Sequence, residues 1–307
     1  MTIIFSSQPF YGRYVQRSTP DDIVPSHISE NGKLWPFFQG CLGAIDGSHI
    51  HISPPAALQS LYRNWKGFLS QNCLFICNFS MFFTYILTGW EGSATDARVW
   101  ADALVKGFRV PAGFYYLADA GFPHCPELLV PFRGVRYHLQ EWGAANVRYV
   151  FASKCIYYYF TYSCSPVNAK ELFNLRHAMA RNVIECIFGV LKQRFRILLL
   201  PPRYPLEFQP RIPAALCALQ NFIQEVDQDE GELPTDAHQA AYEPFPSDVD
   251  GDHPGNDGFI TDENEGNSEV KARRMNIANE MWERYLQHRA DHAADDDDDD
   301  DDFFGEL

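Results

Sequence analysis

The stretch GCLGAIDGSHIHI (residues 40–52) predicts the centre of the fold. Its apolar run CLGAID (41–46) is typical of a short buried strand, and this strand ends in one carboxylate, Asp46. The alternating SHIHIS (48–53) extends the strand past a bulge that we expect at Gly47. An aspartate before a glycine is most often a turn residue, but strand ends are also where α/β proteins build sites.

The segments on either side of this strand predict an α/β or α+β fold with a mixed sheet. Apolar, aromatic runs suit an antiparallel strand pair, and a further strand ends in a second aspartate, Asp119, again followed closely by a glycine. Helical spacing and Gly or Pro stops mark three helices. The strand pair is expected at 72–90, the strand at 113–122, and the helices at 93–107, 169–200 and 210–226.

Composition excludes some classes of protein. No run approaches the ~18 apolar residues of a membrane span. The first residues lack the basic and then apolar pattern of a signal peptide, so we expect an intracellular protein without a membrane segment. The eight cysteines form no C-x-x-C pair and mostly lie in apolar runs, which favours reduced core thiols over a disulfide or zinc framework.

Charge divides the chain into a body and a tail. Residues 1–226 carry 20 Lys+Arg and 14 Asp+Glu, a net charge of +6, whereas residues 227–307 carry 5 and 26, a net charge of -21. The body is expected to meet polyanions. The tail is expected to be mostly disordered, with one isolated amphipathic helix at 271–290 and eight aspartates at 295–302. It could mimic nucleic acid, contact basic proteins or aid solubility.

Three acids on three separate elements are candidate metal ligands. Asp46 and Asp119 end strands, and Glu185 lies beside the apolar stripe of the long helix. Three carboxylates form a hard-oxygen cage suited to Mg²⁺ or Mn²⁺, and two such ions would support phosphodiester cleavage. Alternatively, the aspartates are turn residues, and Glu185 pairs with Arg181 on a solvated helix face.

Further residues are weaker candidates. Asp96 either lines the site or is an early-helix acid favoured by the helix dipole. His49 and His51 share one strand face, as metal ligands do and as satisfied strand histidines also do. Four cations of the long helix are candidate phosphate contacts, or else belong to a solvated face: Arg181, Lys192, Arg194 and Arg196.

From about Trp35 to Val226 the chain resembles the DDE nuclease domain of PIF/Harbinger-type transposases of the fungal type. The matching stretches include GCLGAIDGSHI, TYILTGWEGSATDARVW, YYLADAGF and HAMARNVIECIFGVLKQRFRIL, in the family's order. The resemblance implies an RNase H-like fold with a mixed five-stranded sheet flanked by helices. It also implies a nuclear endonuclease that cuts DNA with two divalent metal ions held by Asp46, Asp119 and Glu185.

The chain also departs from this family pattern. Residues 1–36 are interpreted as a linker left from a missing N-terminal region, and residues 37–226 as the nuclease domain. An aromatic stretch at 146–167 interrupts the pattern as an insertion or a retained intron. These departures favour a second hypothesis, a catalytically idle DNA- or protein-binding protein that is held in the nucleus by a separate DNA-binding partner.

Overall fold

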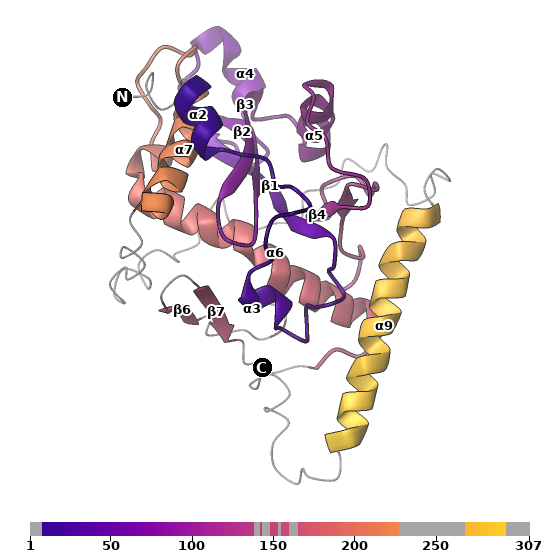
Figure 1. Cartoon of the computed structure of the whole chain (residues 1–307). Coiled ribbons are helices and arrows are strands. Elements are labelled where there is room, and N and C mark those ends of the chain that lie inside the picture. Colours follow the sequence, from indigo (N-terminus) through magenta and orange to yellow (C-terminus); the bar gives the residue numbers. More distant parts are fainter. Residues whose placement is uncertain are drawn as a thin grey trace.

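The computed structural model of the chain describes residues 8–137, 142, 148–152, 155–159, 165–226 and 268–292. At its centre lies a five-stranded sheet in the order β3-β2-β1-β4-β5 (Figure 1). The first three strands pair antiparallel, whereas β4 and β5 run parallel to β1. The strands are β1 (Cys41–His51), β2 (Ser70–Cys77), β3 (Phe83–Glu91), β4 (Tyr115–Leu117) and β5 (Leu128–Leu129). The predicted mixed sheet is confirmed, and its order is consistent with an RNase H-like fold.

Strand β1 is more regular than the sequence predicts. Its pairing with β2 continues without a break from Asp46 opposite Phe75 to Gly47 opposite Leu74. The bulge predicted at Gly47 is therefore wrong. The irregularity lies instead on the other edge of β1, where the pairing with β4 shifts between Cys41 and Ala44.

Helices cover both faces of this sheet, which explains why β2 is buried along its whole length. Because side chains alternate across a strand, Leu74 and Ile76 pack with Trp100 of helix α5, while Phe75 packs with Phe188 of helix α6 on the opposite face. A strand covered on both faces reads as a continuous apolar run. The predicted strand pair and its burial are thus confirmed.

Helices form in the three segments predicted to be helical, but α6 ends at Arg194, before the predicted end at residue 200, and residues 196–199 form the separate 3-10 helix η3. The long helix α6 begins after Asn168, whose side chain accepts a hydrogen bond from the Glu171 amide (3.0 Å), and α5 stops before Gly107 at φ +88°. None of the described helices combines the length and apolar character needed to cross a bilayer. The helices are α2 (Gln8–Tyr14), α3 (Ser26–Ser29), η1 (Ala56–Leu58), α4 (Gln59–Tyr62), α5 (Asp96–Val105), α6 (Ala169–Arg194), η3 (Arg196–Leu199), α7 (Arg211–Val226) and α9 (Ser268–His292).

Helix α9 packs against α6, as Figure 1 shows for the two ribbons. Met281 and Tyr285 are buried in the core cluster that α6 shares with the sheet. Arg274 donates hydrogen bonds to the carbonyl groups of Val130 (3.3 Å) and Pro131 (2.9 Å). The amphipathic helix predicted here is confirmed, but its predicted isolation is wrong, because its apolar face completes the core.

The predicted insert contains a β-hairpin. Strands β6 (Arg148–Ala152) and β7 (Cys155–Tyr159) pair antiparallel in a separate two-stranded sheet. Residues 227–267 and 293–307, including the aspartate run, lie outside the described residues, so the disorder predicted for them stays a prediction.

Candidate active site

Asp46 lies in the middle of β1, not at its end, because the strand continues to His51. It nevertheless lies just past the end of the parallel pairing, because the pairing of β1 with β4 reaches only Ala44. Beyond that point one edge of β1 has no partner in β4, and the Asp46 side chain keeps 17% of its surface exposed. The acid therefore sits where the parallel part of the sheet stops.

The glycine after Asp46 makes room for another acid. A Cβ atom on Gly47 would lie 2.0 Å from Oδ1 of Asp96, so no larger residue fits while Asp96 keeps its place. Asp96 is the first residue of α5, and its Oδ1 accepts a hydrogen bond from Nδ2 of Asn72 (2.9 Å). Asn72 thereby fixes the start of α5 against β2, the neighbour of the strand that carries Asp46.

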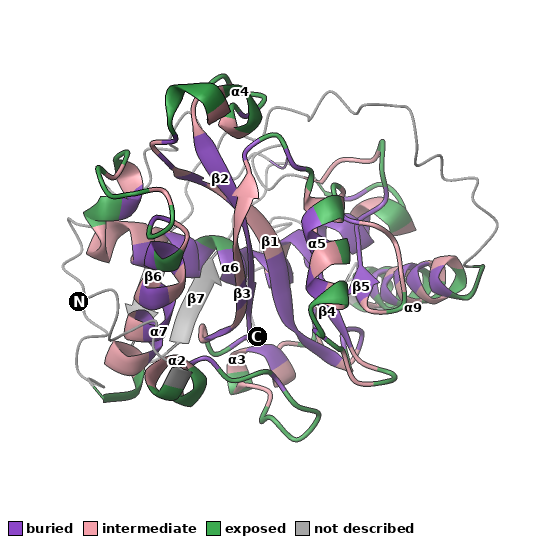
Figure 2. Ribbon diagram, turned by 90° about the horizontal axis from the view of Figure 1, so that it is seen from above, coloured by how far each residue is buried: buried purple, intermediate pink, exposed green. Residues whose placement is uncertain are grey.

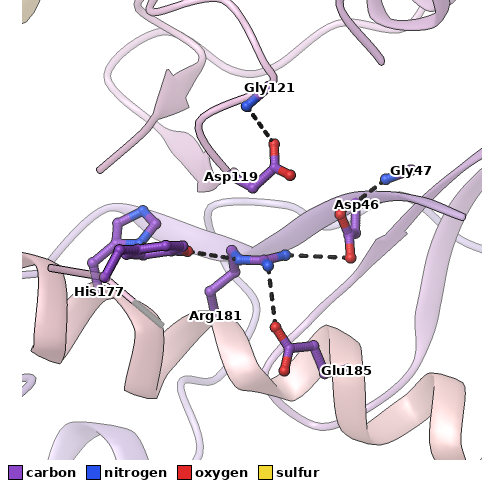
Figure 3. Close-up of polar contacts among 8 residues, drawn as sticks. Asp46, Gly47, Asp119, Gly121, His177, Arg181 and Glu185 are labelled. Atoms are coloured by element: carbon purple, nitrogen blue, oxygen red, sulfur yellow. Dashed lines mark hydrogen bonds and ion pairs between the residues drawn. The ribbon is translucent and has the colours of Figure 1, made fainter. Parts of the chain in front are cut away.

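Asp119 and Glu185 come from two other elements. Asp119 follows β4 by two residues, and its Oδ1 accepts a hydrogen bond from the Gly121 amide (2.9 Å). Glu185 projects from α6, and its side chain is 48% exposed. Figure 3 shows the carboxylates of Asp46, Asp119 and Glu185 arranged around the guanidinium of Arg181.

Arg181 links two of these acids. Its side chain is only 5% exposed, its Nη1 lies 3.3 Å from Oδ2 of Asp46, and its Nη2 lies 3.1 Å from Oε1 of Glu185 (Figure 3). Its Nε donates a hydrogen bond to the hydroxyl of Tyr137 (2.9 Å). Burial alone would lower the pKa of Arg181, but Tyr137 and the three acids outweigh it and hold this pKa well above its usual value. Arg181 is a permanent cation that neutralises part of the acidic cluster.

Tyr137 and His177 hold Arg181 in place from the other side. Nε2 of His177 donates to the carbonyl of Leu129 (2.8 Å), and burial lowers the pKa of His177 to about 3, so the ring is neutral near pH 7. Its Nδ1 lies 3.4 Å from the hydroxyl of Tyr137, which can donate to it. A chain of contacts thus runs from the backbone of β5 through two rings to Arg181.

The donor set, but not its spacing, suits a divalent metal. Carboxylate oxygens are the ligands that Mg²⁺ and Mn²⁺ prefer. Within the described part of the chain, however, no three His, Cys, Asp or Glu side chains lie close enough to hold one ion. Arg181 lies between Asp46 and Glu185, so sharing an ion requires their contacts with it to change.

The other predicted site residues are distributed around this cluster. Nδ1 of His49 lies 3.0 Å from the hydroxyl of Ser70, as expected for a satisfied strand histidine. Arg194 donates to Oε1 of Gln220 (2.6 Å), which ties α6 to α7. Lys192 is partly exposed and Arg196 is exposed. Burial and the charge of Lys192 lower the pKa of His51, which places this lysine near the end of β1.

Two residues of the cluster were not predicted from the sequence. Tyr137 lies in a loop without a periodic pattern, and nothing in the sequence distinguishes it. His177 precedes Arg181 by four residues, so the two share one face of the helix. That spacing was the available signal for His177.

Comparison with known proteins identifies the family. Residues 45–221 match the model of a family described as DDE superfamily endonuclease, and the chain belongs to this family. It is 27% identical over 198 residues to the human protein named "Putative nuclease HARBI1", covering 62% of this chain and 48% of that protein. It is 25% identical over 210 residues to "Protein ALP1-like" of Arabidopsis thaliana, covering 61% and 44%. The chain spans about half the length of these relatives, and no solved structure matches it.

Proposed function

We propose that this domain cleaves phosphodiester bonds of DNA, with Asp46, Asp119 and Glu185 as the ligands of Mg²⁺ or Mn²⁺. The observation that carries the proposal is the meeting of three acids from β1, the β4 loop and α6 around one buried arginine. The family supports it, because DDE superfamily endonucleases generally depend on divalent metals. The names of the animal relatives support a nuclease as well.

The bound metal would supply an activated water or hydroxyl and would stabilise the charge of the leaving oxygen. The chain's own residues hold the ligands in place. The Gly121 amide fixes the Asp119 carboxylate, whereas Arg181 holds Asp46 and Glu185 until a metal takes its place. A ligand whose orientation is set before binding loses less freedom on binding.

DNA is the substrate that the surrounding charge favours. Lys192 of α6 and Arg196 of η3 follow Glu185 along the chain, with Arg194 between them, and would hold phosphates on either side of the cut. Cleavage of chromosomal DNA requires access to the nucleus, so we place the protein there. A separate DNA-binding protein would supply sequence recognition in this scheme.

A second function, binding without cleavage, is favoured by one observation. Arg181 already satisfies Asp46 and Glu185 as an internal cation, and such an arrangement is stable without a metal. A protein of this kind would bind DNA or a protein partner through its basic surface and would leave the phosphodiester backbone intact. The two functions differ in whether added Mg²⁺ leads to cleavage.

Asp46→Asn tests the proposal. The substitution keeps the shape of the side chain and removes the charge, so Mg²⁺-dependent nicking of supercoiled plasmid DNA should be lost. Removing one group that acts only through the metal costs on the order of a thousandfold or more in rate. Asp21→Asn is the matched control, because Asp21 is an exposed acid outside the cluster.

Folding of both variants is checked by circular dichroism and thermal unfolding. Nicking by wild type and by Asp21→Asn, but not by Asp46→Asn, supports the enzyme. Nicking by folded Asp46→Asn would reject the assignment of this acid. A wild-type protein that binds DNA but does not nick it with Mg²⁺ or Mn²⁺ would favour the second function.

A further inference from the structure

A second site lies at the C-terminal end of α6. There η3 and the chain that follows it surround an open cavity of about 450 Å³. The segment contains three prolines, Pro201, Pro202 and Pro205, which follow η3 and cannot continue it. The cavity is lined by Arg196, Ile197, Leu200, Pro201, Pro202, Arg203 and Tyr204.

The cavity is anchored to the strand that carries Asp46. Gln209 is almost fully buried and accepts a hydrogen bond from the Ser53 amide (2.8 Å), two residues beyond the end of β1. Its Nε2 donates to the carbonyl of Ser53 (3.1 Å) and to the carbonyl of Tyr204 (2.7 Å). One buried amide thus fixes the wall of the cavity to the central sheet. The cavity is pre-formed with respect to the acids.

The lining combines flat apolar surfaces with positive charge. Tyr204 is 57% exposed and Leu200 is 67% exposed, so both present large apolar groups at the surface. Arg196 and Arg203 are exposed cations on the same wall. A planar apolar ligand that carries a negative group matches this combination.

Along the chain, the cavity follows the helix that carries Glu185. Lys192 follows Glu185 by seven residues, which is two helical turns, so the two side chains leave the same side of α6 about 10 Å apart along its axis. Arg196 comes four residues later, at the edge of the cavity. In the sequence, Lys192 thus stands between Glu185 and the Arg196 of the cavity.

We infer that this cavity binds an unpaired nucleotide of the DNA substrate, a few nucleotides away from the scissile phosphate. Its base stacks on Tyr204 and the prolines, while Arg196 and Arg203 hold the adjoining phosphates. Base stacking on aromatic rings together with backbone contacts to cations is how single strands are bound without sequence readout. A duplex keeps its bases stacked inside, so only an unpaired or extruded base can reach such a cavity.

This inference rests on the proposed function for its choice of DNA, but its test needs no cleavage. Arg196 and Arg203 favour a nucleotide over an apolar peptide, which offers them no anionic group. The test compares binding of a blunt duplex with binding of duplexes that end in three unpaired nucleotides, on the 3′ or on the 5′ strand. Ca²⁺ replaces Mg²⁺ throughout, and a 2-aminopurine in the overhang reports stacking by fluorescence.

Wild-type protein should bind one of the overhang duplexes about tenfold more tightly than the blunt duplex and quench its 2-aminopurine. Tyr204→Ala should remove both effects, while Tyr204→Phe, which keeps the ring, should retain them. Arg203→Ala should weaken overhang binding more than Arg211→Ala does. Arg211 is an exposed cation outside the lining and serves as the matched control.

Equal binding of all three duplexes by wild type would overturn the inference. So would a Tyr204→Ala variant that keeps the preference, or equal losses in Arg203→Ala and Arg211→Ala, which would indicate a diffuse charge effect. The outcome is separate from that of the nicking assay. A protein that prefers the overhang but does not nick DNA would support the nucleotide-binding cavity and reject the proposed nuclease activity. A protein that nicks DNA but shows no overhang preference would support the nuclease activity and reject the cavity.

Discussion

The two faces of the central sheet are built from different chemistry. On one face, α5 buries Val99, Trp100 and Ala103 against an apolar surface. On the opposite face, α6 also buries polar and charged side chains, and Figure 2 shows that it is buried along much of its length. These polar residues are Asn174, Arg176, His177, Arg181 and Asn182.

This difference indicates that the α6 face has a role beyond stabilising the fold. Burying a polar group is costly unless its hydrogen bonds are made again inside the protein. Two of these residues make such bonds: the Asn174 side chain accepts from the Phe132 amide and donates to its carbonyl, and His177 donates to Leu129. The α5 face stabilises the sheet, and the α6 face positions charges.

The largest expected effect on stability lies on the α5 face. Trp100→Ala should lower the free energy of unfolding by about 3–5 kcal/mol, because it empties a large volume from a closely packed core. Trp100 is 2% exposed and packs edge-on against Phe108. Chemical denaturation measures the loss, and Mn²⁺ binding to the folded variant should stay unchanged. Altered Mn²⁺ affinity would mean that the two faces are coupled.

Arg181→Met should have a smaller effect on stability and a larger one on metal binding. Breaking a fully buried ion pair costs about 3–5 kcal/mol, and the loss here should be lower because water can reach Glu185. The acids also lose their internal cation, so we expect Mn²⁺ to bind more tightly. Isothermal titration calorimetry measures the affinity.

Arg181→Lys is the matched control, because it keeps the charge but loses the second donor group. Its Mn²⁺ affinity should stay closer to that of the wild type than that of Arg181→Met does. Unchanged affinity in both variants would contradict a competition between Arg181 and a metal for the same carboxylates.

Near pH 7 the smallest effect comes from His177, because it changes stability only as the pH falls. The pKa of His177 is about 3 in the folded protein and about 6.5 in an unfolded chain, so the unfolded state binds the proton first as pH falls. His177 therefore lowers stability by about 1.4 kcal/mol per pH unit between about pH 6.5 and pH 3, in proportion to the protons bound. His177→Gln should flatten this decline relative to wild type in denaturation curves measured across that range. Identical slopes would show that His177 does not titrate in this way.

Local patterns were enough to predict the strand pair, α5, α6 and α7, because each has its own periodicity and stop signals. They placed Asp46 at a strand end, however, because an Asp-Gly pair is a turn signal, and only the pairing with β2 carries the strand onward. A helical wheel put Arg181 beside Glu185, as the structure does. It gave no information on what faces that side of the helix, so the contact with Asp46 was missed.

Local patterns could not predict the hydrogen bonds of Gln209 or the docking of α9, for the same reason. Each depends on partners far away in sequence: Ser53 for Gln209, and the α6 core for α9. The amphipathic face of α9 indicated that it needs a partner, but not that the partner lies in the same chain.

Helix α9 binds to the rest of the chain much as a separate ligand would, but it is covalently attached. It lies beyond the family match, which ends at residue 221, yet it fills part of the core. Covalent attachment through residues 227–267 keeps α9 at a high local concentration near α6. For short flexible linkers such effective concentrations are about millimolar. A single proteolytic cut between residues 227 and 267 would turn this docking into an equilibrium between two molecules. Dilution would then strip α9 from the protein and expose the apolar surface beneath it.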